Sequence, residues 1–101
     1  MVLKRDDKPD AIFCVNDDCA SGVLYAAQIL GLKIPEELAI CGFSNAPLCR
    51  NTFPMLTTVE QHGVEIGKHA IIRLLKRLSG DERIAQTEMI ATDLIVRETT
   101  K

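Results

Sequence analysis

Three consecutive polar residues, Asn16, Asp17 and Asp18, lie between Cys14 and Cys19, directly after an apolar run. Amide, carboxylate and thiol groups grouped in this way have three common uses: they bind a metal, cap a helix, or line the rim of a ligand pocket. The other cysteines and histidines test the first use, and the surrounding elements test the other two.

The cysteines and histidines do not have the spacing of a metal site. No two of the four cysteines are separated by the two residues of a zinc knuckle. His62 and His69 are seven residues apart, which is almost two turns of a helix. Cys14 and Cys41 fall inside apolar runs, where a free thiol acts as a small apolar side chain. We therefore expect no metal and no other cofactor.

The motifs of common catalytic sites are also missing. The sequence contains no G-x-S-x-G elbow, no G-x-x-x-x-G-K-[ST] phosphate loop and no G-x-G-x-x-G turn. Ser44 follows Gly42 and Phe43, but no histidine lies near it in the sequence. Asp17 and Asp18 are adjacent, so at a helix start they point about 100° apart and do not share a proton. We predict that the protein is not an enzyme.

Length and charge limit the class of protein. The chain has 101 residues, enough for one small domain, and 47% of them are apolar, which argues against disorder. The net charge is −2, so the chain lacks the basic excess that binds a nucleic-acid backbone. A local basic cluster is typical of the solvated C-terminal half of a helix; it comprises Lys68, Arg73, Lys76 and Arg77.

Neither a membrane anchor nor a secretory leader is expected. No apolar run approaches the roughly 20 residues that a membrane span needs. In residues 1–7 the charges precede any apolar core, unlike in a signal peptide. Four unpatterned cysteines without a leader favour a reducing compartment, so we expect a cytoplasmic protein.

The first half of the chain predicts an α/β fold. Residues 11–15 are apolar and short, which is typical of a strand buried on both faces of a parallel sheet. Asp17 or Asp18 then caps a helix, whose apolar stripe runs from residue 20 to residue 30. Residues 38–43 form a second apolar strand. Strand, helix and strand with short links make a βαβ unit with parallel strands.

The second half carries weaker signals. We expect an irregular segment at residues 44–55, a short extended segment at 56–59 and a helix at 62–79. A polar loop at 81–86 and a last strand at 90–96 would follow.

Two polar pairs follow the two strands of the βαβ unit. Asn16 and Asp17 end the first strand, and Ser44 and Asn45 end the second. Open α/β sheets bind ligands beyond the carboxyl ends of their strands, so all four residues are candidate ligand contacts. Capping is the alternative, favoured for Asp17, whereas ligand contact is favoured for Asn16 and Ser44; both remain open for Asn45.

Several segments resemble LacI/GalR-type transcriptional repressors. Residues 9–18, PDAIFCVNDD, resemble the family segment P-D-A-I-F-C-x-N-D, and residues 31–40 resemble its G-L-x-V-P link. Gly42 and Phe43, then PMLTTVEQ at residues 54–61, resemble G-F/Y-D followed by P-x-L-T-T-V-x-Q. The closing residues 94–100 match as well, so the resemblance covers nearly the whole chain.

The resemblance implies a type I periplasmic-binding-protein-like sensor core, of which this chain is an incomplete C-terminal part. Residues 1–56 would be the βαβ unit of the C-terminal lobe with a dimerisation loop. Residues 57–89 would be the crossover and a helix of the N-terminal lobe, and residues 90–101 the return strand and tail. Family members bind operator DNA through an N-terminal segment absent from this chain, and they bind a small effector between the lobes.

The resemblance also implies site residues. Asn16 matches an effector-contacting Asn of the family. Ser44 stands where the family usually has an Asp that binds sugar or base groups, and the lost negative charge favours a sugar acid over a neutral sugar. Tyr25, Leu48 and Phe53 match homodimer contacts, although Tyr25 and Leu48 would fit the domain's own core equally well.

The helix at residues 62–79 raises a packing question, because its usual partner sheet in the family is missing. In the chain alone, we expect its apolar stripe to pack on another copy or to fold back onto the βαβ unit. Two rival functions remain, a periplasmic sugar-binding transport protein and a ligand-free self-association module. The cysteines and the T-T-V-x-Q segment disfavour the transport protein.

Overall fold

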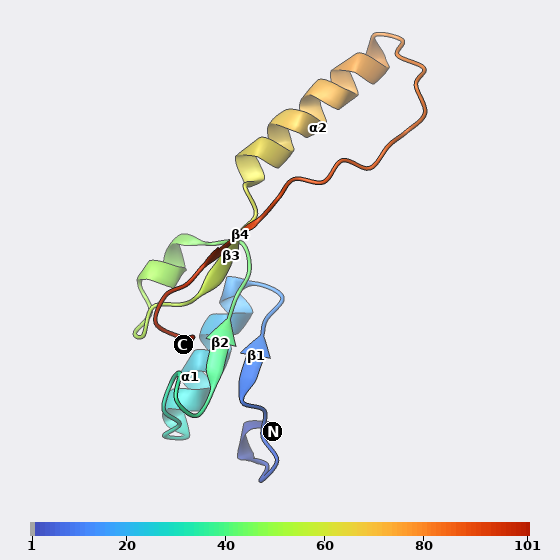
Figure 1. Ribbon diagram of the computed structural model, residues 1–101. Helices are drawn as coiled ribbons and strands as arrows, with labels where there is room; N and C mark the ends of the chain where they lie inside the picture. The colour runs from blue at the N-terminus through green and yellow to red at the C-terminus, as the bar shows by residue number, and fades with distance from the viewer. Residues whose placement is uncertain (1) are drawn as a thin grey trace.

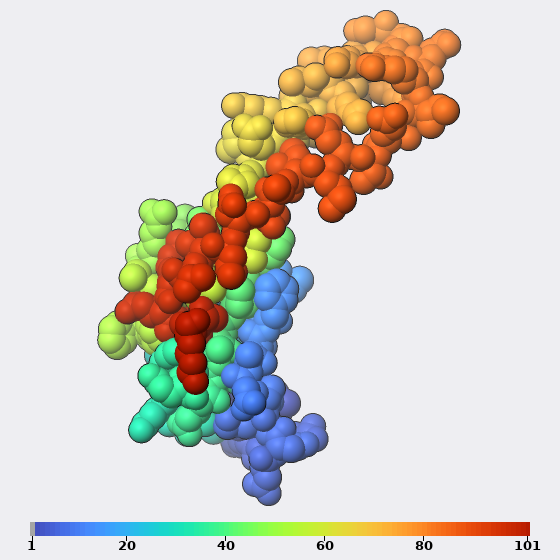
Figure 2. All heavy atoms as spheres, in the orientation of Figure 1, coloured from blue at the N-terminus to red at the C-terminus, as the bar shows by residue number. Residues whose placement is uncertain are grey.

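The chain folds into a body and a projecting arm (Figure 1). The computed structural model describes residues 2–101, so residue 1, the first of the predicted 1–56 unit, lies outside it. We define the body as residues 2–62 and 93–101, and the arm as residues 63–92. The radius of gyration is 18.3 Å and the extents are 59 × 26 × 19 Å, whereas a compact chain of this length has a radius of about 13 Å. The space-filling view shows the same extended outline (Figure 2).

The body contains the predicted βαβ unit. After a short 3-10 helix, η1 (Val2–Lys4), strand β1 (Ala11–Phe13) pairs in parallel with β2 (Ala39–Cys41), with Ile12 opposite Ile40. Helix α1 (Asp17–Ile29) connects them. Both strands are shorter than the predicted ranges 11–15 and 38–43, although the backbone N–H of Cys14 still donates to the carbonyl of Cys41 (2.8 Å). The predicted parallel βαβ unit is confirmed.

Only one face of this sheet is covered. Ile40 and Cys14 are buried together with Ala20, Leu24 and Ala27 of α1 in one apolar cluster. On the other face Phe13 is 66% exposed, and Val15, just beyond β1, is 79% exposed. The prediction that residues 11–15 are buried on both faces is therefore wrong, because α1 packs on a single side.

Asn16 caps α1, and the prediction that Asp17 or Asp18 does so is wrong. Asn16 has an extended backbone, and its Oδ1 accepts from the N–H of Cys19 (2.8 Å). Asp17 and Asp18 already lie in the first helical turn, where a negative charge is favourable near the helix N-terminus. The cap lies one residue earlier than predicted because the helical conformation begins at Asp17.

The segments after β2 extend the body. The expected irregular region contains a 3-10 helix, η2 (Pro47–Arg50), and is followed by strand β3 (Thr58–Glu60). Strand β3 pairs antiparallel with β4 (Asp93–Ile95), which is shorter than the predicted range 90–96. The N–H groups of Gly42 and Ser44 donate to the carbonyls of Thr57 and Val59 (both 2.9 Å), so β3 lies alongside the residues that follow β2.

The end of the chain also packs on β2. The N–H of Ile40 donates to the carbonyl of Thr99 (2.9 Å), and the Thr99 hydroxyl donates back to the carbonyl of Ile40 (2.6 Å). Thr99 is fully buried, and its Oγ1 also accepts from the N–H of Thr57 (2.9 Å). Thr99, which follows the arm in sequence, is therefore part of the interior of the body.

The arm consists of α2 (Gly63–Leu78) and the segment that returns from it to β4. The helix agrees with the predicted range 62–79, but none of its residues is buried. Its exposed apolar residues include Val64, Ile71, Leu75 and Leu78. The helix points away from the body (Figure 1), so the expectation that it folds back onto the βαβ unit is wrong. Packing on another copy stays a prediction.

Gly42, directly after β2, lies close to the start of α1. A Cβ at this position would overlap the Asp17 carboxylate and come within 3.2 Å of Asp17 Cα and 3.3 Å of Ala20 Cβ. The substitution Gly42→Ala is therefore expected to lower the free energy of unfolding by about 1–3 kcal/mol through overpacking. Gly22→Ala in α1 is the control, because no heavy atom lies within 4 Å of its added Cβ. It should raise the free energy of unfolding by about 0.5–1 kcal/mol, and urea unfolding that shows no difference between the variants would contradict this account.

Candidate functional site

The four predicted ligand residues lie at the carboxyl ends of β1 and β2. Asn16 and Asp17 stand at the junction of β1 and α1, and Ser44 and Asn45 begin the segment after β2. The carboxylate of Asp17 joins the two places, because its Oδ2 accepts from the N–H of Ala46 (2.7 Å). We call Asn16 together with residues 44–46 the rim, and residues 44–46 alone the rim turn.

Asn16 has one polar group left for a ligand. Its Oδ1 is occupied by the cap of α1, whereas its side chain is exposed and its Nδ2 has no hydrogen-bond partner within residues 2–101. The residue therefore combines the two roles that the sequence analysis weighed as alternatives, since the oxygen caps and the nitrogen can donate to a bound molecule.

Asp17 is engaged inside the body. It is 1% exposed, and besides the bond from Ala46 its Oδ1 accepts from the hydroxyl of Thr58 (2.6 Å). A direct ligand contact by Asp17 stays a prediction, and it would require the buried carboxylate to become accessible. Burial raises the pKa of the neighbouring Cys49 thiol to about 11, and Asp17 adds to that rise, so this thiol stays protonated at neutral pH.

The rim turn has an unusual backbone. Ser44 and Asn45 have φ angles of 101° and 54°, a region that most L-residues avoid and that Asn tolerates better than most. All three N–H groups of the turn are bound: that of Ser44 by the Val59 carbonyl, that of Asn45 by Thr58 Oγ1 (3.2 Å), and that of Ala46 by Asp17. These bonds fix the turn against β3 and α1.

Both ends of the Asn45 side-chain amide have a partner in the body, unlike the Ser44 hydroxyl. Asn45 Nδ2 donates to Glu60 Oε2 (2.9 Å), and its Oδ1 accepts from Arg97 Nη2 (2.8 Å). Hydrogen bonds from Asn45 and from the N–H of His62 lower the pKa of Glu60. The half-buried Ser44 hydroxyl has no partner within the described part of the chain, so it remains available to a ligand together with Asn16 Nδ2.

The sequence analysis missed three residues of this site, Thr58, Glu60 and Arg97. Thr58 and Glu60 are two apart in β3 and lie on one face of the strand, so period-two spacing could have paired them. Arg97 is 52 residues away from Asn45 in sequence, and no local pattern connects them.

Metal ligation finds no support at this site. Among residues 2–101, no group of three His, Cys, Asp or Glu side chains is arranged to hold a metal ion. Burial and the neighbouring Cys19 thiol raise the pKa of Cys14 to about 11, so Cys14 is a protonated thiol rather than a thiolate ligand at neutral pH. Over the same residues, no helix has the length and apolar character needed to cross a membrane.

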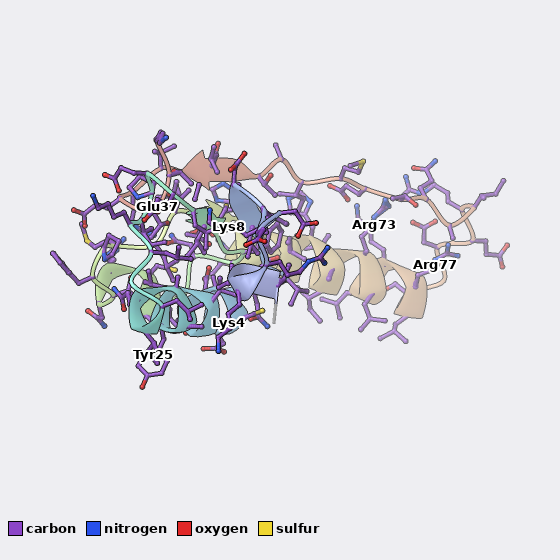
Figure 3. All side chains as sticks on the ribbon, turned by 90° about the horizontal axis from the view of Figure 1, so that it is seen from below. Lys4, Lys8, Tyr25, Glu37, Arg73 and Arg77 are labelled. Carbon is purple, nitrogen blue, oxygen red and sulfur yellow. The ribbon has the colours of Figure 1, made fainter. Side chains whose placement is uncertain are left out.

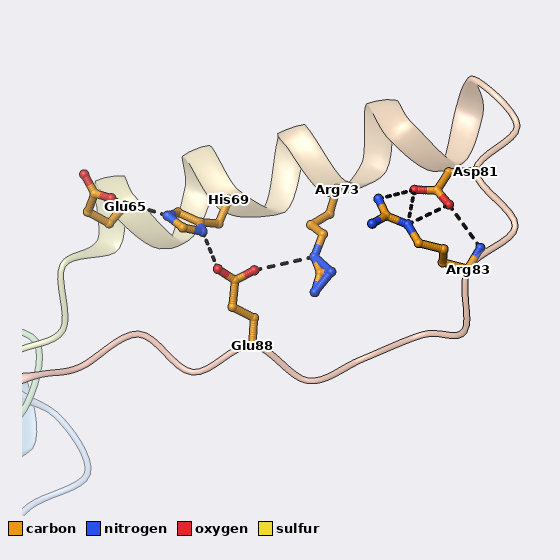
Figure 4. Close-up of polar contacts among 6 residues, drawn as sticks. All are labelled: Glu65, His69, Arg73, Asp81, Arg83 and Glu88. Atoms are coloured by element: carbon orange, nitrogen blue, oxygen red, sulfur yellow. Dashed lines mark hydrogen bonds and ion pairs between the residues drawn. The ribbon is translucent and has the colours of Figure 1, made fainter.

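A second group of polar residues lies on the arm (Figure 4). Glu88 of the returning segment pairs with His69 (2.6 Å) and Arg73 (3.5 Å) of α2, and Arg83 pairs with Asp81 (2.7 Å). Arg83 lowers the pKa of Asp81 well below its usual range. These residues form part of the lining of an open cavity of about 590 Å³ between helix and segment. The pairs made by Glu88 fasten the segment to α2.

The predicted dimer residues divide into two kinds. Tyr25 is 67% exposed and points away from the body (Figure 3), and Phe53 is 86% exposed. Gln28 of α1 joins the helix to the loop that carries Phe53, because its Nε2 donates to the Phe53 carbonyl (2.6 Å). Leu48 packs against the core, as its alternative reading expected. Ile29, also exposed and one helical turn after Tyr25, was missed by the sequence analysis.

Comparison of the sequence with known protein families places the chain in one of them. A family model described as a periplasmic binding protein-like domain matches residues 2–100. The chain belongs to this periplasmic binding protein-like family. The predicted fold class is thereby confirmed.

Relatives within the periplasmic binding protein-like family are transcriptional repressors. The chain is 38% identical to the repressor PurR of Vibrio vulnificus and 39% identical to the repressor CytR of Escherichia coli, with 99% of the chain aligned in both. A periplasmic binding protein/LacI transcriptional regulator from Alkaliphilus metalliredigens, solved with D-xylulofuranose, is 34% identical with a TM-score of 0.82 over 91% of the chain and 35% of that protein. The resemblance to LacI/GalR-type repressors is therefore confirmed.

The chain spans about 30% of the length of these curated relatives, at 30% of PurR and 29% of CytR. It corresponds to part of the effector-binding domain of LacI-family transcriptional repressors. Its relatives are repressors rather than enzymes, in line with the missing catalytic motifs.

Proposed function

We propose that the chain is the effector-sensing and dimerisation part of a LacI-type regulator that binds a small sugar or sugar acid at the rim. The observation that carries this proposal is the Asp17–Ala46 hydrogen bond, which joins the ends of β1 and β2 where Asn16 Nδ2 and the Ser44 hydroxyl have no partner among residues 2–101. Operator DNA would be bound by an N-terminal segment outside this chain, and the protein would act in the cytoplasm as a homodimer.

The body and arm suit the division into two lobes that this function requires. Residues 1–56 would belong to the C-terminal lobe, residues 57–89 would cross to the other lobe and supply one of its helices, and residues 90–101 would return. A ligand held between the lobes would favour one arrangement of them and thereby change how the dimer presents its DNA-binding segments.

The rim favours an anionic ligand. Ser44 stands where the family usually has an Asp, the Asp17 carboxylate is buried and engaged, and both oxygens of Glu60 already accept hydrogen bonds. The remaining available groups are a donor and a hydroxyl, which suit the carboxylate and the hydroxyl groups of a sugar acid.

The dimer surface would be the exposed face of α1 together with the loop after η2. Tyr25, Ile29 and Phe53 expose large apolar side chains there, and such side chains are common anchors of protein interfaces. The core-packed Leu48 would support this surface from below.

Ligand stabilisation of the full-length protein tests the proposal. We expect D-gluconate or D-galacturonate to raise the melting temperature more than sucrose or D-xylulose does. Asn16→Asp keeps the cap oxygen but removes the donor, so it should weaken sugar-acid binding at least about tenfold with little loss of stability. Asp18→Asn, at the exposed neighbouring position, is the control and should leave binding unchanged.

Two other results would contradict parts of this proposal. Equal or tighter binding of the neutral sugars would contradict the anionic assignment. A robust dimer that no sugar or sugar acid stabilises would contradict effector sensing and favour the ligand-free self-association module.

A further inference from the structure

The arm is joined to the body by two strands, which we call the neck: β3 with His62 leads out, and β4 leads back (Figure 1). The rim turn is bonded to the first of them through the Ser44 N–H and the Val59 carbonyl. The neck therefore lies directly beside the residues to which the proposed function assigns the ligand.

We propose that Asn45 is a positioning residue, which ties the rim turn to both sides of the neck instead of contacting the effector. The two ends of its side-chain amide point to different partners. Nδ2 donates to Glu60, the last residue of β3, and Oδ1 accepts from Arg97, two residues beyond β4. Each end of the amide thus already has a partner inside the body.

Arg97 links Asn45 to the other side of the neck. Besides its bond to Asn45, the guanidinium donates through Nη1 to the carbonyl of Leu56 (2.9 Å). The N–H of Arg97 donates to the hydroxyl of Thr57 (2.9 Å). Arg97 thus holds the return segment against the residues before β3, and it also binds Asn45 of the rim turn.

Glu60 links Asn45 to the arm. Its Oε1 accepts from the N–H of His62 (2.8 Å), the residue directly before α2. The His62 ring in turn pairs with Asp93 at the start of β4 (Nε2 to Oδ2, 2.6 Å). Two hydrogen bonds therefore separate the rim turn from the first residue before α2, and a third contact reaches the opposite strand.

The consequence is a direct path from ligand to lobe. Asn45 directly follows Ser44 in the rim turn, so a ligand that shifts the backbone at Ser44 also shifts Asn45. The Asn45 amide passes that shift to Glu60 and Arg97, and so to both strands that orient the arm. This inference rests on the proposed function for the meaning of the rim, whereas the contacts themselves are independent of any ligand.

A swap of hydrogen-bond polarity tests this role. In Asn45→Asp, the new carboxylate still accepts from Arg97 but faces the carboxylate of Glu60. In Glu60→Gln, one amide oxygen must serve two donors, Asn45 Nδ2 and the His62 N–H. In the double variant, the Gln nitrogen donates to the Asp carboxylate while its oxygen accepts from His62, so every bond is restored with one polarity reversed.

The readout is amide hydrogen exchange of the full-length protein over residues 58–66 and 93–97. Each single variant should speed exchange in both segments by about tenfold, and the double variant should return to within about twofold of the parent. Asn51→Asp is the control, because Asn51 is exposed and its side chain makes no hydrogen bond within the described residues.

Two results would overturn the proposal. Either the single variants leave exchange in the neck and in the first turn of α2 unchanged, or the double variant shows the summed effect of the two without rescue. A residue that only stabilised the rim turn would alter exchange there without reaching residues 63–66. Because no ligand is added, failure of this cycle is distinct from failure of the ligand screen.

Discussion

Asp17→Ala is expected to lower the free energy of unfolding by about 3 kcal/mol or more. The Asp17 carboxylate is the acceptor for two donors, the buried Thr58 hydroxyl and the part-buried Ala46 N–H. A buried donor without a partner costs about 1–3 kcal/mol, and here both donors lose their acceptor at once. The change also removes a negative charge from the first turn of α1, where it is favourable.

Urea unfolding of three variants checks this expectation. Asp17→Asn retains one acceptor oxygen and should lose less stability than Asp17→Ala. Asp18→Ala is the matched control, since Asp18 lies in the same turn but is exposed, and it should change stability by less than about 1 kcal/mol. Equal losses for Asp17→Ala and Asp18→Ala would mean that the buried bonds contribute nothing.

The 101-residue chain alone is expected to self-associate through α2. This helix has 16 residues and no buried side chain, and a helix of that length without packing is only marginally stable in water. Ile71 and Leu75 are one turn apart in its apolar stripe, and burying each is worth about 1.5–3 kcal/mol. The paired change Ile71→Glu and Leu75→Lys removes both while preserving net charge and adding a favourable pair at positions i and i+4.

Sedimentation velocity over a range of concentrations measures the effect. The α2 variant should weaken association at least about 100-fold, since two apolar side chains are lost on each copy. The control Ile84→Glu with Met89→Lys makes the same chemical change at exposed positions of the arm outside α2 and should leave association intact. A chain that is monomeric throughout, with α2 helical by circular dichroism, would rule out association.

Regular apolar patterns made much of the fold predictable. The run at residues 11–15, the stripe at 20–30 and the run at 38–43 correctly predicted the βαβ unit, and the stripe in residues 62–79 predicted α2. Burial was less predictable, because whether a sheet has one covered face or two depends on which segments pack there. The cap of α1 was misplaced because Asn16, Asp17 and Asp18 are all good capping residues, and the backbone alone selects among them.

The location of the candidate site could be predicted from the topology, but the hydrogen bonds between its residues could not. Parallel strands bring their carboxyl ends to one edge, which placed Asn16 and Ser44 together. The partners that decide what Asn45 does, Glu60 and Arg97, are 15 and 52 residues away in sequence. Such pairs depend on how the neck strands cross the body, which no local pattern encodes.

The buried Thr99 has a consequence for how the protein is made. Its bonds to Ile40 join positions 59 residues apart, and the whole arm is synthesised between them. During translation, β1, α1 and β2 emerge before the arm, and Thr57 can pair with the end of β2, yet Ile40 keeps an unpaired edge until Thr99 leaves the ribosome. Unpaired strand edges are places where chains associate wrongly, so the nascent body is expected to be most exposed to misassociation in the interval before Thr99 is in place.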